Sequence, residues 1–310
     1  MARCCVSVYN ACNSSTQAHS GSRMTSPSPD WLDAQYNNRA RIPEHAQIFQ
    51  RWADASALAR EQSACILDVP YGTGLDETLD VFPSHGPNAP VLVFIHGGWW
   101  RSLDKRDHSF VAPAFTQAGA MVVVPNYALC PAVSIEAITL QMTQALAWIW
   151  RNAAQHGGDR RRIVVAGHSA GGHLAAMMLC CRWREVARDL PAQLVGSVLS
   201  ISGLFDLETL RRTPYLQADL QLTRASAARL SPSLFPPPAG RLFAAVGAFE
   251  SEEFQRQNAL IRKAWGDAAV PVCEAVSNTH HLDILHALVD PHTRLHGLAL
   301  ELLGLSPAVR

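Results

Sequence analysis

The chain has 310 residues, a length that fits one α/β domain and allows a core without disulfides or bound metal. Its 26 lysines and arginines balance its 26 aspartates and glutamates, so the overall charge offers no attraction for nucleic acid or an anionic membrane. No stretch approaches the ~18 consecutive apolar residues that a membrane span requires.

The eight cysteines include two adjacent pairs, Cys4–Cys5 and Cys180–Cys181, and no Cys-x-x-Cys. Such spacing indicates neither a disulfide framework nor a zinc site. We therefore expect free thiols in a reducing compartment, and the predicted location is the cytoplasm.

Residues 1–29 are rich in serine, threonine, asparagine and cysteine and contain no acidic residue. Mitochondrial transit peptides share this bias, but the segment carries only Arg3 and Arg23 and has no clear amphipathic period. We expect a disordered extension, with Met24 as an alternative start, followed by a single domain over residues 30–310.

Helical and strand patterns follow one another along the rest of the chain. The pattern from Asp30 to Ala64 favours a helix, with Ile48, Phe49 and Trp52 on one face. The expected strands are Val91–Ile95, Met121–Pro125, Ile163–Ala166, Leu194–Ile201, Leu242–Val246 and Val270–Val276, and the expected helices between them include Ile135–Gln155 and Gly171–Trp183. Strands that are apolar throughout and alternate with helices predict an α/β fold with a mostly parallel, doubly wound sheet covered by helices on both faces. Ligands then bind beyond the carboxyl ends of the strands.

The sequence Gly167-His168-Ser169-Ala170-Gly171 follows one predicted strand and opens a predicted helix. In that context Gly-x-Ser-x-Gly is typical of a nucleophile elbow, a strained turn that exposes the serine hydroxyl. Side chains two positions either side of Ser169 would collide, and glycine at both places removes the collisions. The free N–H groups of the following helix point at whatever occupies the site. We predict that Ser169 is a nucleophile and not part of a merely structural turn.

A second glycine motif, His96-Gly97-Gly98-Trp99-Trp100, follows the first predicted strand. A tetrahedral oxyanion needs two or three N–H donors in a dry pocket, and consecutive glycines let the backbone approach closely. We predict donors from Gly98 and from Trp99 or Gly97, completed by Ala170, the residue after the nucleophile. The alternative is a glycine-rich turn beside core tryptophans.

The chain order that accompanies such an elbow is serine, then acid, then histidine. The last predicted strand is followed by His280 and His281, and spacing alone does not decide between them. Glu250 is the nearest carboxylate past the preceding strand, where it would hold an imidazole in the required tautomer. Asp206, which ends an earlier strand, is the competing acid, whereas Glu252–Glu253 are expected to open the next helix.

With these residues the chain resembles the α/β-hydrolase superfamily and, more narrowly, its kynurenine formamidase (arylformamidase) branch near the hormone-sensitive-lipase-like esterases. The motif at His96–Trp100 and the elbow "GHSAGGHL" match that branch, and "YNNRARIPEH" at Tyr36–His45 is similar to the amino-terminal segment of its bacterial members. The block "HHLDIL" resembles the His-Phe-x-Ile block of the branch, which selects His281 as the base, with Leu282 replacing phenylalanine. Glu250 stands where the family usually has aspartate.

The resemblance implies hydrolysis of N-formyl-L-kynurenine to L-kynurenine and formate through a formyl-enzyme, with no metal or organic cofactor. It also implies small cap elements from the Asp206–Pro238 segment and the Asp30–Ala64 helix. Trp99, Trp100 and His168 are the predicted substrate contacts, because a crowded pocket suits a formyl group. The expected partner is a small-molecule substrate, with no nucleic acid or membrane, and assembly as a homodimer is left open.

Two other functions compete with this one. A short-acyl carboxylesterase would use the same serine, histidine and glutamate, so the sequence does not separate it from the formamidase. A ligand-binding protein on an inactive hydrolase fold belongs to a different class. The chain disfavours that class because it keeps both the serine and the histidine.

Overall fold

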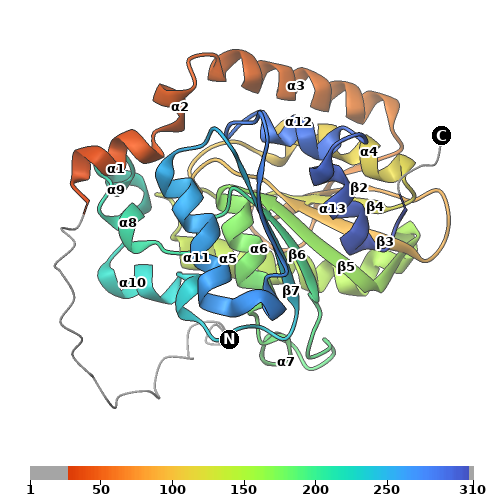
Figure 1. Cartoon of the computed structure of the whole chain (residues 1–310). Coiled ribbons are helices and arrows are strands. Elements are labelled where there is room, and N and C mark those ends of the chain that lie inside the picture. Colours follow the sequence, from red (N-terminus) through yellow and green to blue (C-terminus); the bar gives the residue numbers. More distant parts are fainter. Residues whose placement is uncertain (1–26, 307–310) are drawn as a thin grey trace.

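The computed structural model describes residues 27–306, and an eight-stranded sheet forms their centre (Figure 1). The strand order across the sheet is β1-β2-β4-β3-β5-β6-β7-β8. In chain order the strands are β1 Ile66–Pro70, β2 Thr78–Phe82, β3 Ala89–Ile95, β4 Met121–Pro125, β5 Gly158–His168, β6 Ser197–Ile201, β7 Arg241–Gly247 and β8 Val272–Val276. β2 pairs antiparallel with β1 and β4, and all other neighbours are parallel.

Helices pack on both faces of this sheet. In chain order they are α1 Pro29–Tyr36, α2 Asn38–Arg41, α3 His45–Gln62, α4 Ala112–Gln117, α5 Ile135–Asn152, α6 Ala170–Leu179, α7 Trp183–Val186, α8 Glu208–Arg211, α9 Pro214–Leu220, α10 Arg224–Arg229, α11 Glu252–Ala269, α12 Ile284–Val289 and α13 Arg294–Leu303, with 3₁₀ turns at Lys105–Asp107, Ser109–Val111, Ala153–His156 and Pro232–Leu234. The predicted helix after the elbow therefore ends earlier than expected, at Leu179.

Strand β3 shows how the two faces are filled. Val91, Val93 and Ile95 join a core with side chains of α5, α6 and α11, whereas Leu92 and Phe94 join a second core with side chains of α3, α4, α12 and α13. Successive residues of a strand point to opposite faces, so a strand buried on both sides is apolar throughout. The two groups of helices lie on opposite sides of the sheet in Figure 1. The predicted doubly wound α/β fold is confirmed.

Strand β2 is a part of the sheet that the hydrophobic pattern did not predict. The strand begins with the polar Thr78, and Asp80 interrupts its apolar residues. The Asp80 carboxylate is completely buried. The ammonium of Lys105, itself buried, forms an ion pair with that carboxylate. A buried charge is accommodated here because its partner comes from a distant segment.

The prediction of one helix over Asp30–Ala64 is wrong, because the segment forms three helices. Asn37 leaves the helical conformation with φ −78° and ψ 77°, and its side chain caps α2 by accepting a hydrogen bond from the Ala40 N–H. α2 then stops before Pro43, since proline disfavours a helical conformation in the residue that precedes it. Two changes of direction therefore bring α2 over the edge of the sheet where the site lies.

A small cap gathers beside the carboxyl edge of the sheet, as predicted. α1 packs against α9 and α11, and α8 packs against α9 and α10 (Figure 1, left side). The Asp206–Pro238 segment thus supplies most of the cap, together with α1. By contrast, α3 packs on the sheet itself through Ile48 and Trp52.

The predicted extension at 1–29 lies almost wholly outside the described residues, as does Met24. Pro29 already begins α1, and the Ser28 hydroxyl accepts a hydrogen bond from the Trp31 N–H at 3.2 Å. Cysteines 65, 130, 180, 181 and 273 form no disulfide within residues 27–306, and the three others fall outside that range.

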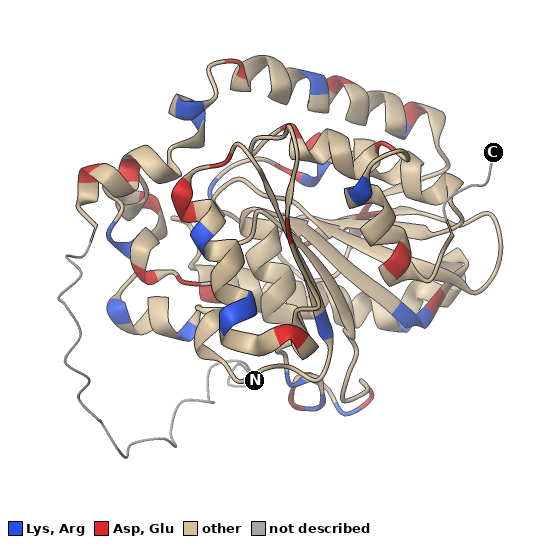
Figure 2. Ribbon diagram, viewed as in Figure 1, with Lys and Arg blue, Asp and Glu red and all other residues tan. Residues whose placement is uncertain are grey.

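The surface of the described part carries mixed charge. Basic and acidic residues are interspersed along the ribbon, without a face of one sign in the view of Figure 2. No helix between residues 27 and 306 is both long enough and apolar enough to cross a membrane.

Candidate active site

Ser169 lies on the turn between β5 and α6, with φ 56° and ψ −117°. Few residues other than glycine adopt this strained region. A Cβ at Gly167 would lie 2.1 Å from the Gly171 carbonyl oxygen, and a Cβ at Gly171 would lie 2.0 Å from the Ile95 carbonyl oxygen. The Ser169 N–H donates to the carbonyl of Ile201 on the next strand at 2.8 Å, which fixes the turn to the sheet. The two glycines are therefore sterically required, as the sequence predicts.

The predicted acid and base meet beyond the ends of β7 and β8. His281 Nδ1 lies 2.7 Å from Glu250 Oε2, and both side chains are buried. The second carboxylate oxygen accepts hydrogen bonds from the Gly247 N–H at 2.7 Å and from the Ser202 hydroxyl. A carboxylate only accepts, so Nδ1 must carry the hydrogen of this bond. Nε2 of His281 is then left as an acceptor, which is the tautomer that a general base requires.

Ser169 and His281 line the same narrow cavity, whose volume is about 40 Å³. Its lining residues are Asn38, Arg39, Phe49, Trp52, Gly98, Trp99, Ser102, Leu103, His168, Ser169, His281 and Leu282. We find no direct hydrogen bond between the Ser169 hydroxyl and the His281 imidazole among the described residues. Such contacts in hydrolases often align only when the substrate is bound.

The competing acid and base have other partners. Asp206 Oδ2 lies 3.3 Å from Arg256 Nη2 in the cap. His280 Nδ1 accepts a hydrogen bond from the Asp283 N–H at 3.2 Å, and its Nε2 lies 3.6 Å from Glu44. The structure thus pairs the predicted glutamate with the histidine that the family resemblance selects.

The His281 ring is held between two other rings. Its centroid lies 4.4 Å from that of Phe254 and 4.7 Å from that of His168. His168 Nε2 is 2.7 Å from the His281 carbonyl oxygen, to which it donates. Burial, and secondarily the neighbouring His281, lowers the pKa of His168 well below its ordinary value, so this imidazole stays neutral. His168 lines the cavity, as predicted for a substrate contact, and it also positions His281.

The segment His96–Trp100, which we call the oxyanion strap, is oriented by the hydrogen bonds that its carbonyl groups accept. The Tyr127 hydroxyl lies 2.9 Å from the carbonyl oxygen of His96 and 3.2 Å from that of Gly97, and donates to this pair. The Gly98 carbonyl accepts from the Ser102 hydroxyl at 3.0 Å. In a trans peptide the C=O and the following N–H point in opposite directions. The strap amides therefore point away from Tyr127 and Ser102.

The N–H groups predicted to bind an oxyanion have no competing partner. Among residues 27–306 we find no hydrogen bond donated by the amides of Gly98, Trp99 and Ala170. Ala170 is fully buried and Trp99 nearly so, and buried amides without partners are rare in folded proteins. A Cβ on Gly97 would lie 3.2 Å from the Ser169 Cβ, so the strap runs directly beside the serine. The strap and the start of α6 thus bring amides without a protein partner close to the Ser169 side chain.

The two tryptophans of the strap point in different directions. Trp99, at φ 55°, lines the cavity and meets Tyr36 edge-on with centroids 5.7 Å apart. Trp100 is 0% exposed and packs against the His173 ring at 5.0 Å. The prediction of Trp100 as a substrate contact is therefore wrong, because consecutive left-handed residues turn it into the core. Of the two tryptophans predicted as substrate contacts, Trp99 is the one that lines the cavity.

Part of the cavity wall comes from residues that the sequence did not place at the site. Asn38 and Arg39 belong to α2, and Phe49 and Trp52 belong to α3. The sequence pattern predicts an apolar helix face that contains Phe49, but it does not indicate which surface that face covers. Nothing in the hydrophobic pattern marks Asn38 or Arg39.

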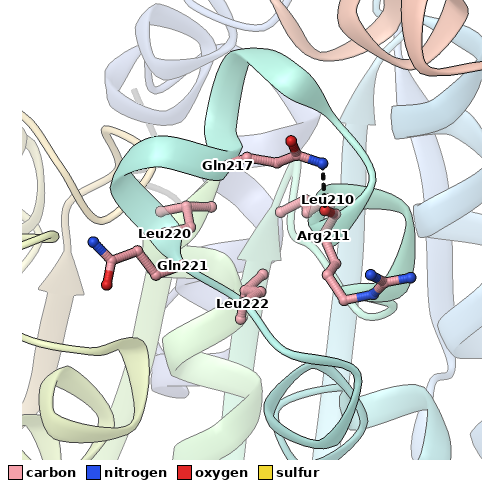
Figure 3. Close-up of a pocket in the computed structure, with 6 residues that line it drawn as sticks. All are labelled: Leu210, Arg211, Gln217, Leu220, Gln221 and Leu222. Carbon is pink, nitrogen blue, oxygen red and sulfur yellow. Dashed lines mark hydrogen bonds between the residues drawn. The ribbon is translucent and has the colours of Figure 1, made fainter.

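A second hollow lies in the cap, between α8, α9 and the loop that follows (Figure 3). Its volume is about 210 Å³, and its lining residues are Leu210, Arg211, Gln217, Leu220, Gln221 and Leu222. Arg211 is paired with Glu208 at 2.6 Å, and the Gln217 amide donates to the Arg211 carbonyl at 3.1 Å. The hollow contains none of the predicted site residues.

The order of Ser169, Glu250 and His281 along the chain defines the class of protein. The serine follows β5, its carboxylate follows β7 and the histidine follows β8, all at the carboxyl edge of a mostly parallel sheet. This chain order and the elbow are those of an α/β-hydrolase.

Comparison with known proteins narrows the class. The sequence matches the family described as BD-FAE over residues 79–222. It is 32% identical over 296 residues to the kynurenine formamidase of Danio rerio. The aligned residues cover 91% of this chain and 98% of that protein. A solved structure from Silicibacter sp. tm1040, whose protein is provisionally named a thioesterase, is 32% identical in sequence and superposes with a TM-score of 0.75. The superposition covers 85% of this chain and 97% of that chain. The carboxylesterase NlhH of Mycobacterium tuberculosis is 41% identical over 104 residues, 33% of this chain and 31% of that protein.

The chain belongs to the kynurenine formamidase family and is a hydrolase of the arylformamidase or esterase type. The predicted fold class and family are confirmed.

Proposed function

We propose that this protein hydrolyses N-formyl-L-kynurenine to L-kynurenine and formate, with Ser169 as the nucleophile. The observation that carries the proposal is the Glu250–His281 hydrogen bond beside the cavity that Ser169 lines. The name of the Danio rerio relative supports a formamide as the substrate. Because Glu250 keeps its carboxylate through one extra methylene, it replaces the usual aspartate of the family without loss of the hydrogen bond.

In the first half of the proposed reaction, Ser169 Oγ attacks the formyl carbon while His281 Nε2 accepts the hydroxyl proton. A C–O bond forms, and the carbonyl electron pair moves onto the formyl oxygen. The amides of Gly98, Trp99 and Ala170 donate to this oxyanion. Glu250 stabilises the imidazolium that forms, because the short hydrogen bond to Nδ1 persists when Nε2 is protonated.

In the second half, the tetrahedral intermediate collapses and the C–N bond breaks. His281 Nε2 gives its proton to the departing aromatic amine, which leaves as L-kynurenine, and Ser169 carries a formyl ester. A water molecule then attacks this ester while His281 accepts its proton. The ester C–O bond breaks, Ser169 regains a proton from His281, and formate departs.

The size of the cavity supports a one-carbon acyl group. The whole cavity measures about 40 Å³, so only a small acyl group fits beside Ser169 as the side chains now stand, and the aryl portion requires the cavity mouth to open. Trp99 and the elbow leave little room for a longer acyl chain at Ser169. The aryl portion of the substrate would lie toward Phe49 and Trp52, on the α3 side.

The test compares kcat/KM of the purified protein for N-formyl-L-kynurenine, p-nitrophenyl acetate and p-nitrophenyl butyrate. We expect the formamide to be turned over at least as efficiently as the activated acetate ester, and the butyrate to be the poorest of the three. A preference for the esters by orders of magnitude would instead establish the second candidate, a short-acyl carboxylesterase. The similarity to NlhH over 104 residues favours that candidate.

Tyr127→Phe tests whether the strap orientation matters for turnover. The change removes the hydroxyl that holds the His96 and Gly97 carbonyls, so the strap amides are less well aimed. We expect kcat to fall about 10- to 100-fold with little change in KM, somewhat less than the loss of a whole oxyanion donor. Steady-state kinetics with N-formyl-L-kynurenine and a thermal unfolding curve measure the effect. An unchanged kcat would show that Tyr127 has no role in orienting the strap.

A further inference from the structure

The cavity at Ser169 is lined on one side by polar groups that the hydrolytic reaction does not use. Asn38 is only 7% exposed, and its Nδ2 has no hydrogen-bond partner among the described residues. A buried amide group without a partner is destabilising, and such groups in native proteins are rare. Asn38 is also one of the residues that line the cavity, so a ligand bound there is a candidate for the missing acceptor.

Arg39 lies next to Asn38 on the same wall and carries a positive charge. It is the one Lys, Arg, Asp or Glu among the residues that line this cavity. No ion pair within residues 27–306 includes Arg39. Its guanidinium carbon lies 5.7 Å from the centroid of the Phe49 ring, a cation–π contact that keeps the charge at the cavity mouth. The basic character of α2 is visible in Figure 2.

The acidic residues nearest to Arg39 along the chain are engaged elsewhere. Asp33 accepts a hydrogen bond from the Tyr215 N–H at 2.8 Å, and Glu44 lies 3.6 Å from His280. The guanidinium is thus left without a protein carboxylate in the described part of the molecule.

The wall is held in a fixed place by buried contacts of the preceding helix. The Tyr36 hydroxyl, at the end of α1, donates to Glu253 on α11 at 2.7 Å. Burial raises the pKa of Tyr36, with Glu253 as the next cause, so the hydroxyl keeps its proton. Tyr36 also packs edge-on against Trp99 and Phe254. Asn38 follows two residues later and is therefore positioned relative to the strap.

We propose that Asn38 and Arg39 bind a carboxylate of the substrate and thereby select an amino acid that bears the aryl formamide over a neutral or cationic aryl formamide. This inference rests on the proposed function and names the substrate class more closely. The amide of Asn38 and the guanidinium of Arg39 donate charge-assisted hydrogen bonds to the carboxylate. Such a site disfavours analogues that lack the acceptor, because the buried Asn38 amide then stays unpaired and the exposed Arg39 guanidinium loses its anionic partner.

The other residues that line the cavity give each part of such a substrate a chemically suitable contact. In the proposed complex the formyl group would lie at Ser169, the aryl ring against Phe49 and Trp52, and the carboxylate at α2, all of which line the cavity. Phe49 and Trp52 contact each other with centroids 5.3 Å apart, so they form one continuous aromatic wall between the two polar ends.

The test uses two substrates that differ by the carboxylate. N-formyl-L-kynurenine and N-formylkynuramine share the aryl formamide and the amine, but the second has no carboxylate. For Arg39→Met we expect kcat/KM for N-formyl-L-kynurenine to fall about 10- to 100-fold, mainly through KM, as for loss of a hydrogen bond to a charged group. The ratio of kcat/KM between the two substrates should fall by a similar factor, and Asn38→Ala should change it in the same direction. The control is Arg51→Met, which removes an exposed arginine of α3 outside the cavity lining and should leave the ratio unchanged.

A second measurement separates this inference from the proposed function. If the unsubstituted protein hydrolyses neither formamide, the proposed function fails. Inhibition of p-nitrophenyl acetate hydrolysis by L-kynurenine and by kynuramine still tests the carboxylate site. Arg39→Met should weaken inhibition by L-kynurenine and should leave or strengthen inhibition by the cationic kynuramine. Equal effects on both compounds, or no effect on either, would overturn the carboxylate site.

Discussion

Ser169→Ala is expected to lower kcat/KM for N-formyl-L-kynurenine by roughly 10⁵-fold while leaving the fold intact. The substitution removes the attacking oxygen but keeps the strap amides, so substrate binding persists without a covalent route. We find no hydrogen bond from the Ser169 hydroxyl to another group within residues 27–306, and alanine adds no atom to the elbow. Little stability should therefore be lost. Steady-state kinetics and a thermal unfolding curve on the same preparation give both quantities.

The unfolding curve makes this result interpretable. A large loss of rate with an unchanged midpoint temperature identifies a group that acts in the reaction. If the alanine variant kept a rate within an order of magnitude of the unsubstituted protein, another residue would have to be the nucleophile. A loss of rate that accompanies a large drop in the midpoint would point to a structural role for the turn.

The second large effect is expected from the two adjacent histidines. His281→Ala should lower kcat/KM for N-formyl-L-kynurenine about as much as Ser169→Ala does, because a nucleophile and its base act as a unit. His280→Ala should keep most of the activity, since His280 contacts Asp283 and Glu44 and does not line the cavity. His281→Gln, which preserves more of the packing against Phe254, should be as inactive as the alanine variant. Parallel kinetics on the three variants provide the ranking, and a larger loss for His280→Ala would assign the base to His280.

The buried carboxylate explains why stability should be recorded for the His281 variants. The Glu250 side chain is completely buried, and without the imidazole its remaining hydrogen-bond partners within residues 27–306 are Ser202 and Gly247. Breaking one partner of a buried charged pair is destabilising. A lower midpoint temperature for His281→Ala is therefore expected. His281→Gln retains a donor for Glu250 and should lose less stability.

The positions of the elbow and of Glu250 beside the residues after β8 could be predicted, because the turn and the parallel strand order constrain them. Glycine is required at 167 and 171 by the turn itself, and the carboxyl ends of parallel strands place the residues after β7 and β8 beside it. The choice of His281 over His280 came from the family resemblance. The packing of His281 between Phe254 and His168 supplies the structural reason.

The remaining features depend on contacts between distant segments. From the sequence alone, Asp80 predicts the end of a strand, because its ion pair with the distant Lys105 is not visible in the pattern. Trp100 turns into the core because of two left-handed residues that no periodicity shows. Asn38 and Arg39 reach the site only because α1 is anchored to α11 and the helix breaks at Asn37. Patterns along one segment carry no information about such placements.

The most direct test of the central claim is covalent labelling of the purified protein with a fluorophosphonate, followed by peptide mapping. Phosphonylation requires a serine whose hydroxyl is activated by a base and whose oxyanion is stabilised. We predict that the label resides on Ser169, that it appears in step with the loss of formamide hydrolysis, and that Ser169→Ala is not labelled. A label on a different residue, or undiminished labelling of Ser169→Ala, would contradict the assignment of Ser169 as the nucleophile.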